Sequence, residues 1–246
     1  MFGRCWKVHP ALLGLAAALV VALSGGAQAE TITLRSGNGT VPGTDSLITM
    51  KIGPANSPFG ALTAGDFADA RTGANAFLID NHPAWKDHLD SDPSAEWISS
   101  HASGASEGST ALFAIDFTIS AASISSAILD FSFLIDNDLG DAVNEGLFVN
   151  ETAVAGTKLL GGNQSYFQVD QGFTGLDITA LVNSGANTLY VNAVDLGGPG
   201  ALQFSATIDV TAGELEVAIP EPAALALLAV GLMGTGLLRR RAARRA

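Results

Sequence analysis

Cysteine is nearly absent from this sequence. The only cysteine is Cys5, which stands ahead of an apolar run at Ala11–Leu23. A disulfide needs two cysteines, so the residues after Cys5 can form neither a disulfide among themselves nor a catalytic thiol. Any fold that these residues adopt must be held by non-covalent contacts alone.

Basic residues are scarce between residues 30 and 219. Seven of the 12 basic residues lie nearer the two ends, which leaves five basic and 23 acidic residues in this body, a net charge of −18. Such a surface repels polyanions, so nucleic acid and anionic membrane surfaces are excluded as partners. Neutral glycans and divalent cations remain compatible with this charge.

Helical periodicity is also scarce in the body. Short apolar and β-branched runs are separated by Gly, Asn, Asp, Ser and Pro, and Leu112–Ile119 and Gln203–Val210 alternate clearly between apolar and small or polar residues. This pattern predicts an all-β protein, a single β-sandwich of jelly-roll type at residues 30–213. Leu176–Val182 is the one segment where a short helix is expected. The nine predicted strands are Thr31–Arg35, Leu47–Ile52, Ala76–Asp80, Ala111–Ser120, Ser126–Ile135, Gly146–Val149, Tyr166–Asp170, Thr188–Val194 and Ala201–Val210.

Residues 1–29 have the pattern of a secretory signal peptide. Arg4 and Lys7 precede the apolar run, and Ala27 and Ala29 form an Ala-x-Ala cleavage site. We therefore expect export through the Sec translocon and a mature chain that begins at Glu30 and contains no cysteine.

Residues 220–246 follow a different pattern, after a short linker at 214–219. Pro220, Glu221 and Pro222 are followed by an apolar run at Ala223–Leu238 and by the basic residues Arg239, Arg240, Arg241, Arg244 and Arg245. At about 1.5 Å per residue, a helix over 223–238 spans about 24 Å, enough for transient insertion into the inner membrane. The arginines orient it with their own end in the cytoplasm. This order resembles the PEP-CTERM sorting signal of Gram-negative bacteria, which implies cleavage by an exosortase.

The body has a second resemblance, over about Ala76–Val210. A strand ending in Asp136-Asn137 precedes Leu147-Phe148-Val149-Asn150, and Gly185-Ala186-Asn187-Thr188-Leu189 leads into a later strand. This order is similar to the galactose-binding-like jelly rolls of secreted bacterial proteins. The resemblance implies a carbohydrate-binding or adhesive module without catalysis.

The segment from 136 to 145 is dense in oxygen ligands. Asp136, Asp138, Asp141 and Glu145 fall within ten residues, and Ca²⁺ prefers six to eight oxygen ligands on a bendable loop. The spacing does not match an EF-hand, so the alternatives are a calcium loop of another kind and an Asx-rich turn between strands. No cofactor is required, and Ca²⁺ is the one that the sequence leaves open.

Aromatic and catalytic residues leave further alternatives. Trp85 and Trp97 are candidates for stacking on sugar rings, or for the core of the sheet. Gly104-Ala105-Ser106-Glu107-Gly108 matches the nucleophile motif of hydrolases, but a strand is expected after it where that motif needs a helix. His82, His88 and His101 could contribute to a zinc site, but they lack metal-binding spacing. We assign no catalytic residues.

These observations predict an exported, exosortase-sorted protein of the cell surface or extracellular matrix. Its expected role is non-enzymatic, as a glycan-binding or structural component of the exopolysaccharide or biofilm matrix, with extracellular polysaccharide as a candidate partner. The alternatives are a secreted hydrolase or lyase acting on polysaccharide, and a structural protein without a ligand.

The sorting segment generates a direct test. Replacing Pro220, Glu221 and Pro222 by alanine, or deleting Arg239–Ala246, is expected to trap full-length protein in the inner membrane, because the first change removes the extended cleavage motif and the second removes the charges that orient it. Fractionation and mass spectrometry of the host's protein measure this. Unaltered protein that still carries Arg239–Arg245 at the cell surface would contradict the prediction.

Overall fold

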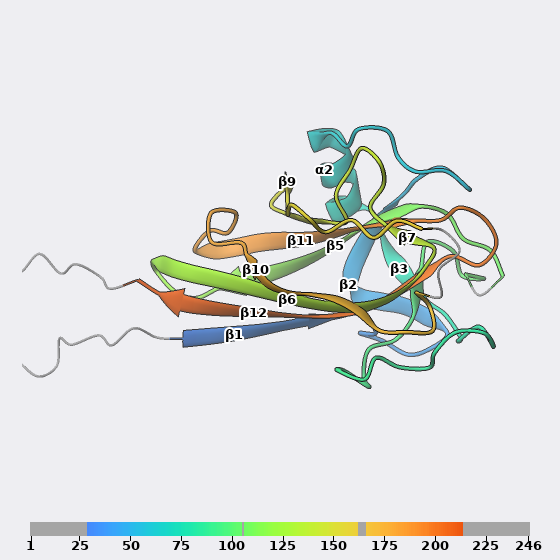
Figure 1. The fold of residues 1–246 in the computed structure, drawn as a ribbon, viewed down its shortest axis with the longest axis horizontal. Coiled ribbons are helices and arrows are strands. Elements are labelled where there is room, and N and C mark those ends of the chain that lie inside the picture. The colour runs from blue at the N-terminus through green and yellow to red at the C-terminus, as the bar shows by residue number, and fades with distance from the viewer. Residues whose placement is uncertain (1–28, 105, 162–165, 214–246) are drawn as a thin grey trace, which may run out of the picture. The chain divides into compact units, whose positions relative to one another are not determined.

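The computed structural model describes residues 29–104, 106–161 and 166–213 (Figure 1). These residues form a 12-stranded, curled sheet in the order β10-β6-β12-β4-β3-β2-β5-β11-β8-β9, with β1 on β12 and β7 on β11. The strands are β1 (Ala29–Arg35), β2 (Gly43–Ile52), β3 (Ala74–Leu78), β4 (Ile98–Ser99), β5 (Ala111–Ile119), β6 (Ile124–Asp136), β7 (Asp138–Leu139), β8 (Leu147–Val149), β9 (Thr152–Ala153), β10 (Gln171–Asp177), β11 (Gly185–Val194) and β12 (Ala201–Ala212). The predicted all-β class is therefore confirmed.

The sheet folds over so that two groups of strands face each other. One group contains β10, β6, β12 and β1, and the other contains β3, β2, β5, β11, β8 and β9. The short strand β4 connects them, because Ile98 is opposite Leu202 of β12 on one side and opposite Leu78 of β3 on the other. The two groups thus belong to one continuous hydrogen-bonded sheet.

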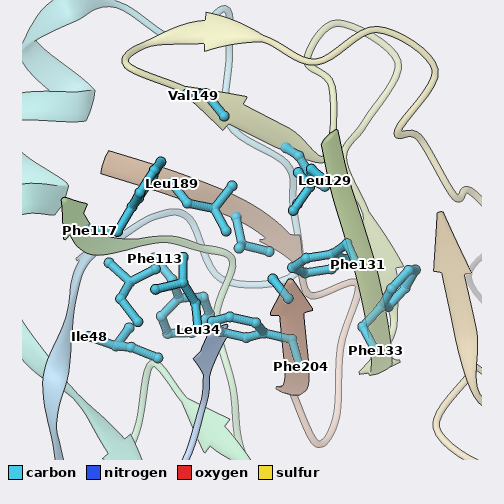
Figure 2. Packing of buried hydrophobic residues seen from close by; sticks show 14 of the residues in the cluster. Leu34, Ile48, Phe113, Phe117, Leu129, Phe131, Phe133, Val149, Leu189 and Phe204 are labelled. Atoms are coloured by element: carbon cyan, nitrogen blue, oxygen red, sulfur yellow. The ribbon is translucent and has the colours of Figure 1, made fainter. Parts of the chain in front are cut away.

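The core lies between the two groups (Figure 2). Phe131 of β6 stacks on Phe204 of β12 with ring centroids 5.4 Å apart, and Phe113 and Leu189 approach from the other group. The two alternating segments place their apolar sides in this core as predicted: Phe113, Ile115, Phe117 and Ile119 from β5, and Phe204, Ala206, Ile208 and Val210 from β12. A period of two puts every second side chain on the same face of the sheet, which is why this prediction holds.

A helix that is not expected from the sequence covers the outer face of β5. Helix α2 (Ala64–Thr72) buries Phe67 and Ala70 against Leu112 and Ala114 of β5. Thr63 donates its backbone N–H and its hydroxyl to the carboxylate of Asp66, which closes the start of the helix. The bonds from Thr63 and Lys51 lower the pKa of Asp66 to about 2. With only two buried positions in nine residues, the helix is too short for its periodicity to be recognised.

Two predicted elements are wrong. Tyr166–Asp170 is not a strand, and the strand β10 begins just after it. Leu176–Val182 is not a helix, because Leu176 and Asp177 complete β10 and the chain then turns. The Asp177 carboxylate accepts the backbone N–H of Thr179 at 2.9 Å, and Ile178 donates its N–H to the Ala127 carbonyl. These bonds hold the backbone in a turn against β6 rather than in a helix.

The predicted terminal segments lie outside the described residues, apart from Ala29 at the start of β1. This applies to residues 1–28 of the signal peptide, including Ala27, to the whole linker at 214–219, and to the sorting segment at 220–246 with its apolar run at 223–238. Within the described part of the chain, no helix is long and apolar enough to cross a membrane.

A buried carboxylate organises the polar loop between β1 and β2. Asp45 is fully buried. Its oxygens accept the backbone N–H groups of Gly37 and Asn38 from the loop, and those of Leu47 and Ile48 from β2. One side chain thereby satisfies four main-chain donors, one buried and three part-buried, that would otherwise lack this acceptor.

This arrangement makes Asp45 critical for stability. Asp45→Ala leaves these donors without their acceptor, so we expect the free energy of unfolding to fall by about 3 kcal/mol or more. Urea denaturation of the full chain measures the loss. Ser46→Ala, which removes one exposed bond to the Asn38 carbonyl, is the matched control and should lose less than about 1 kcal/mol. Equal losses for the two variants would contradict the assignment.

Candidate functional site

The two tryptophans proposed for sugar stacking lie in the core instead. Trp85 is 5% exposed and Trp97 is 1% exposed, and their rings pack on each other with centroids 4.5 Å apart. Leu89, Leu134 and Ala201 complete the cluster around them. A sugar ring needs an exposed aromatic face, and neither tryptophan offers one in this structure. Their burial therefore corrects the stacking assignment.

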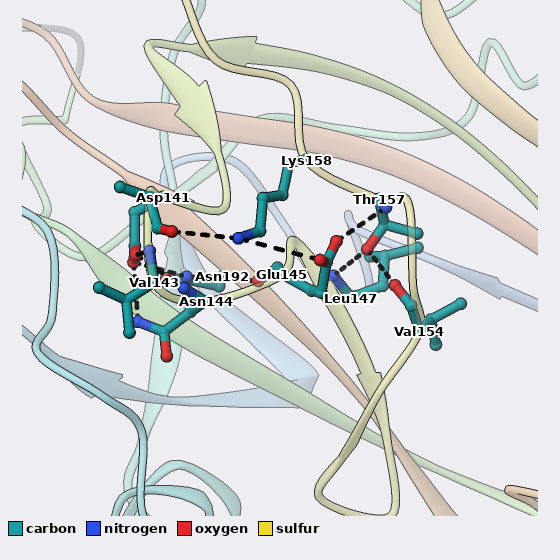
Figure 3. Close-up of polar contacts among 10 residues, drawn as sticks. Asp141, Val143, Asn144, Glu145, Leu147, Val154, Thr157, Lys158 and Asn192 are labelled. Atoms are coloured by element: carbon teal, nitrogen blue, oxygen red, sulfur yellow. Dashed lines mark hydrogen bonds and ion pairs between the residues drawn. The ribbon is translucent and has the colours of Figure 1, made fainter.

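In the oxygen-rich segment from 136 to 145, β6 ends at Asp136, β7 takes Asp138–Leu139, and the residues from Asp141 to Asn144 form a turn (Figure 3). Asp141 accepts the backbone N–H groups of Val143 and Asn144 at 2.7 and 2.8 Å, and its second oxygen accepts side-chain N–H groups of Asn144 and Asn192. This carboxylate thus holds an Asx turn and ties the turn to β11. Asp141 serves the loop as a hydrogen-bond acceptor.

The other carboxylates of this segment face different partners. Asp138 accepts the N–H of Gly161 at 3.1 Å. Glu145 accepts the N–H of Thr157 at 3.0 Å and lies 3.9 Å from the ammonium group of Lys158. Among the residues that the structure describes, no group of three or more His, Cys, Asp or Glu side chains could hold a metal ion. The geometry thus favours the turn over a calcium loop formed by Asp136, Asp138, Asp141 and Glu145 together.

The structure also lacks the expected geometry of a hydrolase nucleophile at Ser106 and of a zinc site at the three histidines, within the residues described. Ser106 donates its backbone N–H to the Ser103 carbonyl within a turn, and strand β5 follows where a nucleophile motif needs a helix. His101 bonds to the nearby Ser103 hydroxyl at 2.8 Å. His82 packs against Trp85, and the three histidines do not converge with carboxylates into a metal group in the described structure.

The structure instead brings Asp136 together with Asp195. Asp136 is the last residue of β6, and Asp195 directly follows β11. Both line one small cavity, which Ser100, Ser109 and Gly200 also border. Asn137 fixes this meeting of two strands, because its backbone N–H bonds to the Val194 carbonyl and its side-chain oxygen accepts the N–H of Leu196 at 2.7 Å.

The two carboxylates differ in their hydrogen bonds. Asp136 accepts the Trp85 indole N–H at 3.0 Å and the Asn137 side-chain N–H at 2.6 Å. Asp195 is 2% exposed, and one of its oxygens accepts the N–H of Gly197 at 2.9 Å. Its other oxygen, Oδ2, is buried and has no hydrogen-bond partner among the residues that the structure describes. Leaving such an oxygen unpaired costs about 1–3 kcal/mol or more for a charged group.

Burial raises the pKa of both groups above the ordinary value. For Asp136, the negative charge of Asp195 adds to the effect of burial on the pKa, while the bond from Trp85 and the charge of His82 oppose it. For Asp195, burial raises the pKa and the Gly197 N–H partly offsets it. Of these two acids, only Asp136 is predicted from the sequence as a site residue, and Asp195 is not. The only signal for Asp195 is an acidic residue placed directly after a strand, before Gly197-Gly198-Pro199-Gly200.

The positive charges of the described residues are all paired elsewhere. Arg35 pairs with Asp92, Lys51 with Asp66 and Asp69, Arg71 with Asp116, Lys86 with Asp90 and Asp170, and Lys158 with Glu145. These are the five basic residues of the body. In the described part of the chain, therefore, no lysine or arginine forms an ion pair with Asp136 or Asp195, and no cationic patch invites a polyanion.

Comparison with known proteins identifies one sequence feature. The PEP-CTERM protein-sorting motif matches residues 218–242. This confirms the resemblance drawn from Pro220, Glu221 and Pro222 and from the arginines near the end of the sequence. The motif implies an exported protein that an exosortase sorts to the surface or the extracellular space. No curated protein matches the chain.

Two solved structures are similar at a low level. The native structure of a family 35 carbohydrate binding module from Clostridium thermocellum is 12% identical, with 72% of this chain and 97% of that chain covered and a TM-score of 0.29. Isomalto-dextranase from Arthrobacter globiformis T6, complexed with panose, is 11% identical, with 75% of this chain and 32% of that chain covered and a TM-score of 0.29. At these TM-scores neither similarity supports an argument.

The carboxylate pair generates a pH prediction. Because the pKa of Asp195 is raised above 3.8 in the folded state, the folded protein binds this proton more tightly than the unfolded chain. The contribution of Asp195 to stability is therefore complete below pH 3.8 and is lost as the pH rises through the folded-state pKa. Asp195→Asn removes the buried negative charge that causes this loss. In buffer freed of divalent cations with EDTA at pH 7, we therefore expect the variant to be about 1 kcal/mol more stable than the wild type.

Urea denaturation of the full chain between about pH 4 and pH 7 measures the difference. The difference is expected to shrink as the pH falls. Asp90→Asn is the matched control, because Asp90 has an exposed carboxylate that pairs with Lys86, and it should change stability little at any pH in this range. A wild type that is more stable than Asp195→Asn at pH 7 would contradict the prediction.

Proposed function

We propose that this chain is a non-catalytic glycan-binding protein of the bacterial cell surface or extracellular polysaccharide matrix, built on a jelly-roll sandwich. The sorting motif at residues 218–242 carries the proposal. Because exosortase sorting delivers a folded body outside the cell, the ligands available to that body are those of the surface and the matrix. Polysaccharide is the dominant ligand of that environment.

The ends of the body support an outward display of its loops. β1 begins and β12 ends at the same end of the sheet, where Ala29 is opposite Thr211 (Figure 1). The cavity with Asp136 and Asp195 lies at the other end of β12, where Asp136 is opposite Ala201. At about 3.3 Å per residue, a strand from Ala201 to Ala212 separates these ends by about 36 Å. The loops at the Ala201 end of β12 thus lie away from the end of the sheet at which β12 finishes, and they are the ones that we propose meet a ligand.

Charge supports a neutral glycan as the ligand. The five basic side chains of the body are already bound to carboxylates, and the body carries a net charge of −18. A polymer rich in carboxylates or phosphates would be repelled by this surface. A neutral polysaccharide is not repelled by this charge. Its hydroxyl groups can donate hydrogen bonds to exposed carboxylate oxygens.

One observation favours a second function, that of a polysaccharide hydrolase or lyase. Two carboxylates with raised pKa values share a cavity, and perturbed acids of this kind cluster at catalytic sites. The cavity, however, has room for about one water-sized group, far less than a sugar ring needs. The binding role is therefore the better supported of the two.

Affinity electrophoresis of the exported protein, purified from its host, separates these functions. Gels containing neutral polysaccharides, or the host's own extracellular polysaccharide, are expected to retard the protein, and gels containing an anionic polysaccharide are not. A parallel assay for reducing ends and unsaturated products is expected to find none. Migration unchanged by every polysaccharide would leave a structural role, and product formation that Asp195→Asn abolishes would establish the enzyme.

A further inference from the structure

The cavity lined by Asp136 and Asp195 contains a carboxylate oxygen for which the described residues provide no hydrogen-bond donor. Asp195 is 2% exposed, and its Oδ2 is buried and accepts no hydrogen bond from the described part of the chain. The residue lines the cavity together with Asp136. Gly200 packs closely on the same carboxyl group, since a Cβ at that position would lie 3.1 Å from Cγ of Asp195. The structure thus keeps open a space, bordered by two acids, that a larger residue at position 200 would crowd.

Protein groups do not supply the positive charge that this pair lacks. The lysines and arginines of the described chain are engaged in ion pairs with other acids. Among the described residues, His82 is the base whose charge acts on Asp136, and its ring packs against Trp85 at a centroid distance of 5.3 Å. Trp85 and Asn137 donate to Asp136, and Gly197 donates to Asp195. These neutral donors leave two acids facing the same cavity.

We propose that this cavity binds a hard divalent cation of the Ca²⁺ class between the carboxylates of Asp136 and Asp195. Such ions select carboxylate oxygens and complete their coordination with water molecules. The cavity has room for about one water-sized group, which suits an ion and excludes a sugar. A bound cation gives Oδ2 of Asp195 a partner and compensates the repulsion between the two acids.

The cation site differs from the loop that the sequence indicates. Of the four acids in that loop, only Asp136 contributes, and its partner comes from the end of β11. Asp141 stays engaged with Val143 and Asn144, and Glu145 with Thr157. The cation would therefore join the end of β6 to the end of β11, two strands from opposite groups of the sheet. This proposal is independent of glycan binding.

Thermal unfolding with Ca²⁺ as the probe tests the site. The full chain, purified in a mild detergent and freed of metal with EDTA, is titrated with CaCl₂. At about a hundredfold excess over Kd, the melting temperature of the wild type is expected to rise by about 5–10 °C. Asp195→Asn is expected to abolish the rise. Asp90→Asn, which removes an equal charge from an exposed position, is expected to retain it.

A second readout uses Tb³⁺, which occupies calcium sites and emits after excitation of a nearby indole. Because the Trp85 indole donates to Asp136, wild-type protein is expected to show tryptophan-sensitised emission that excess Ca²⁺ displaces. Asp195→Asn should lose this emission while keeping a cooperative melting transition, which shows that the variant folds. An absence of any Ca²⁺ response in the wild type, or a full response in Asp195→Asn, would overturn the proposal.

Discussion

The burial of two apolar sheet faces against each other is the interaction on which this structure depends. Phe131 and Phe204 on one side meet Phe113 and Leu189 on the other in a single core. Each fully buried side chain of this size contributes about 1.5–3 kcal/mol, whereas an exposed ion pair contributes about 0–1 kcal/mol. The described residues contain no cysteine, so no disulfide shares this task. The charged surface can therefore vary while the alternation of the strands cannot.

Curling one sheet into two facing layers creates a second requirement. Where the chain passes from one layer to the other, its main-chain groups leave the regular ladder and still need partners. Buried polar side chains supply them. Asp45 binds four backbone N–H groups near β2, and Asn187 binds the N–H of Asn183 while donating to two carbonyls of the turn before β11. These side chains hold the loops in place so that the ends of strands can meet.

The carboxylate pair arises from the same geometry. β6 and β11 belong to different layers, yet both end at the cavity, and Asn137 bonds across from one to the other. Most polar groups in the fold find a partner within the chain. Among the described residues, Oδ2 of Asp195 does not, and neither do the amide oxygens of Asn192 and Gln203. Of these three oxygens only that of Asp195 belongs to a carboxyl group, and this makes the cavity chemically distinct from the polar turns around it. The cavity is also too small to hold a sugar ring.

The sequence by itself determined the features that are local. Alternation in β5 and β12 specified the all-β class and the residues of their buried faces, because side chains on a strand repeat every two residues. The sorting motif was equally readable, since a short contiguous segment carries it. Tertiary structure alone decided the burial of Trp85 and Trp97, the position of α2 on β5, and the partner of Asp136. Each of these depends on which distant segments come together, and neither composition nor spacing encodes that choice.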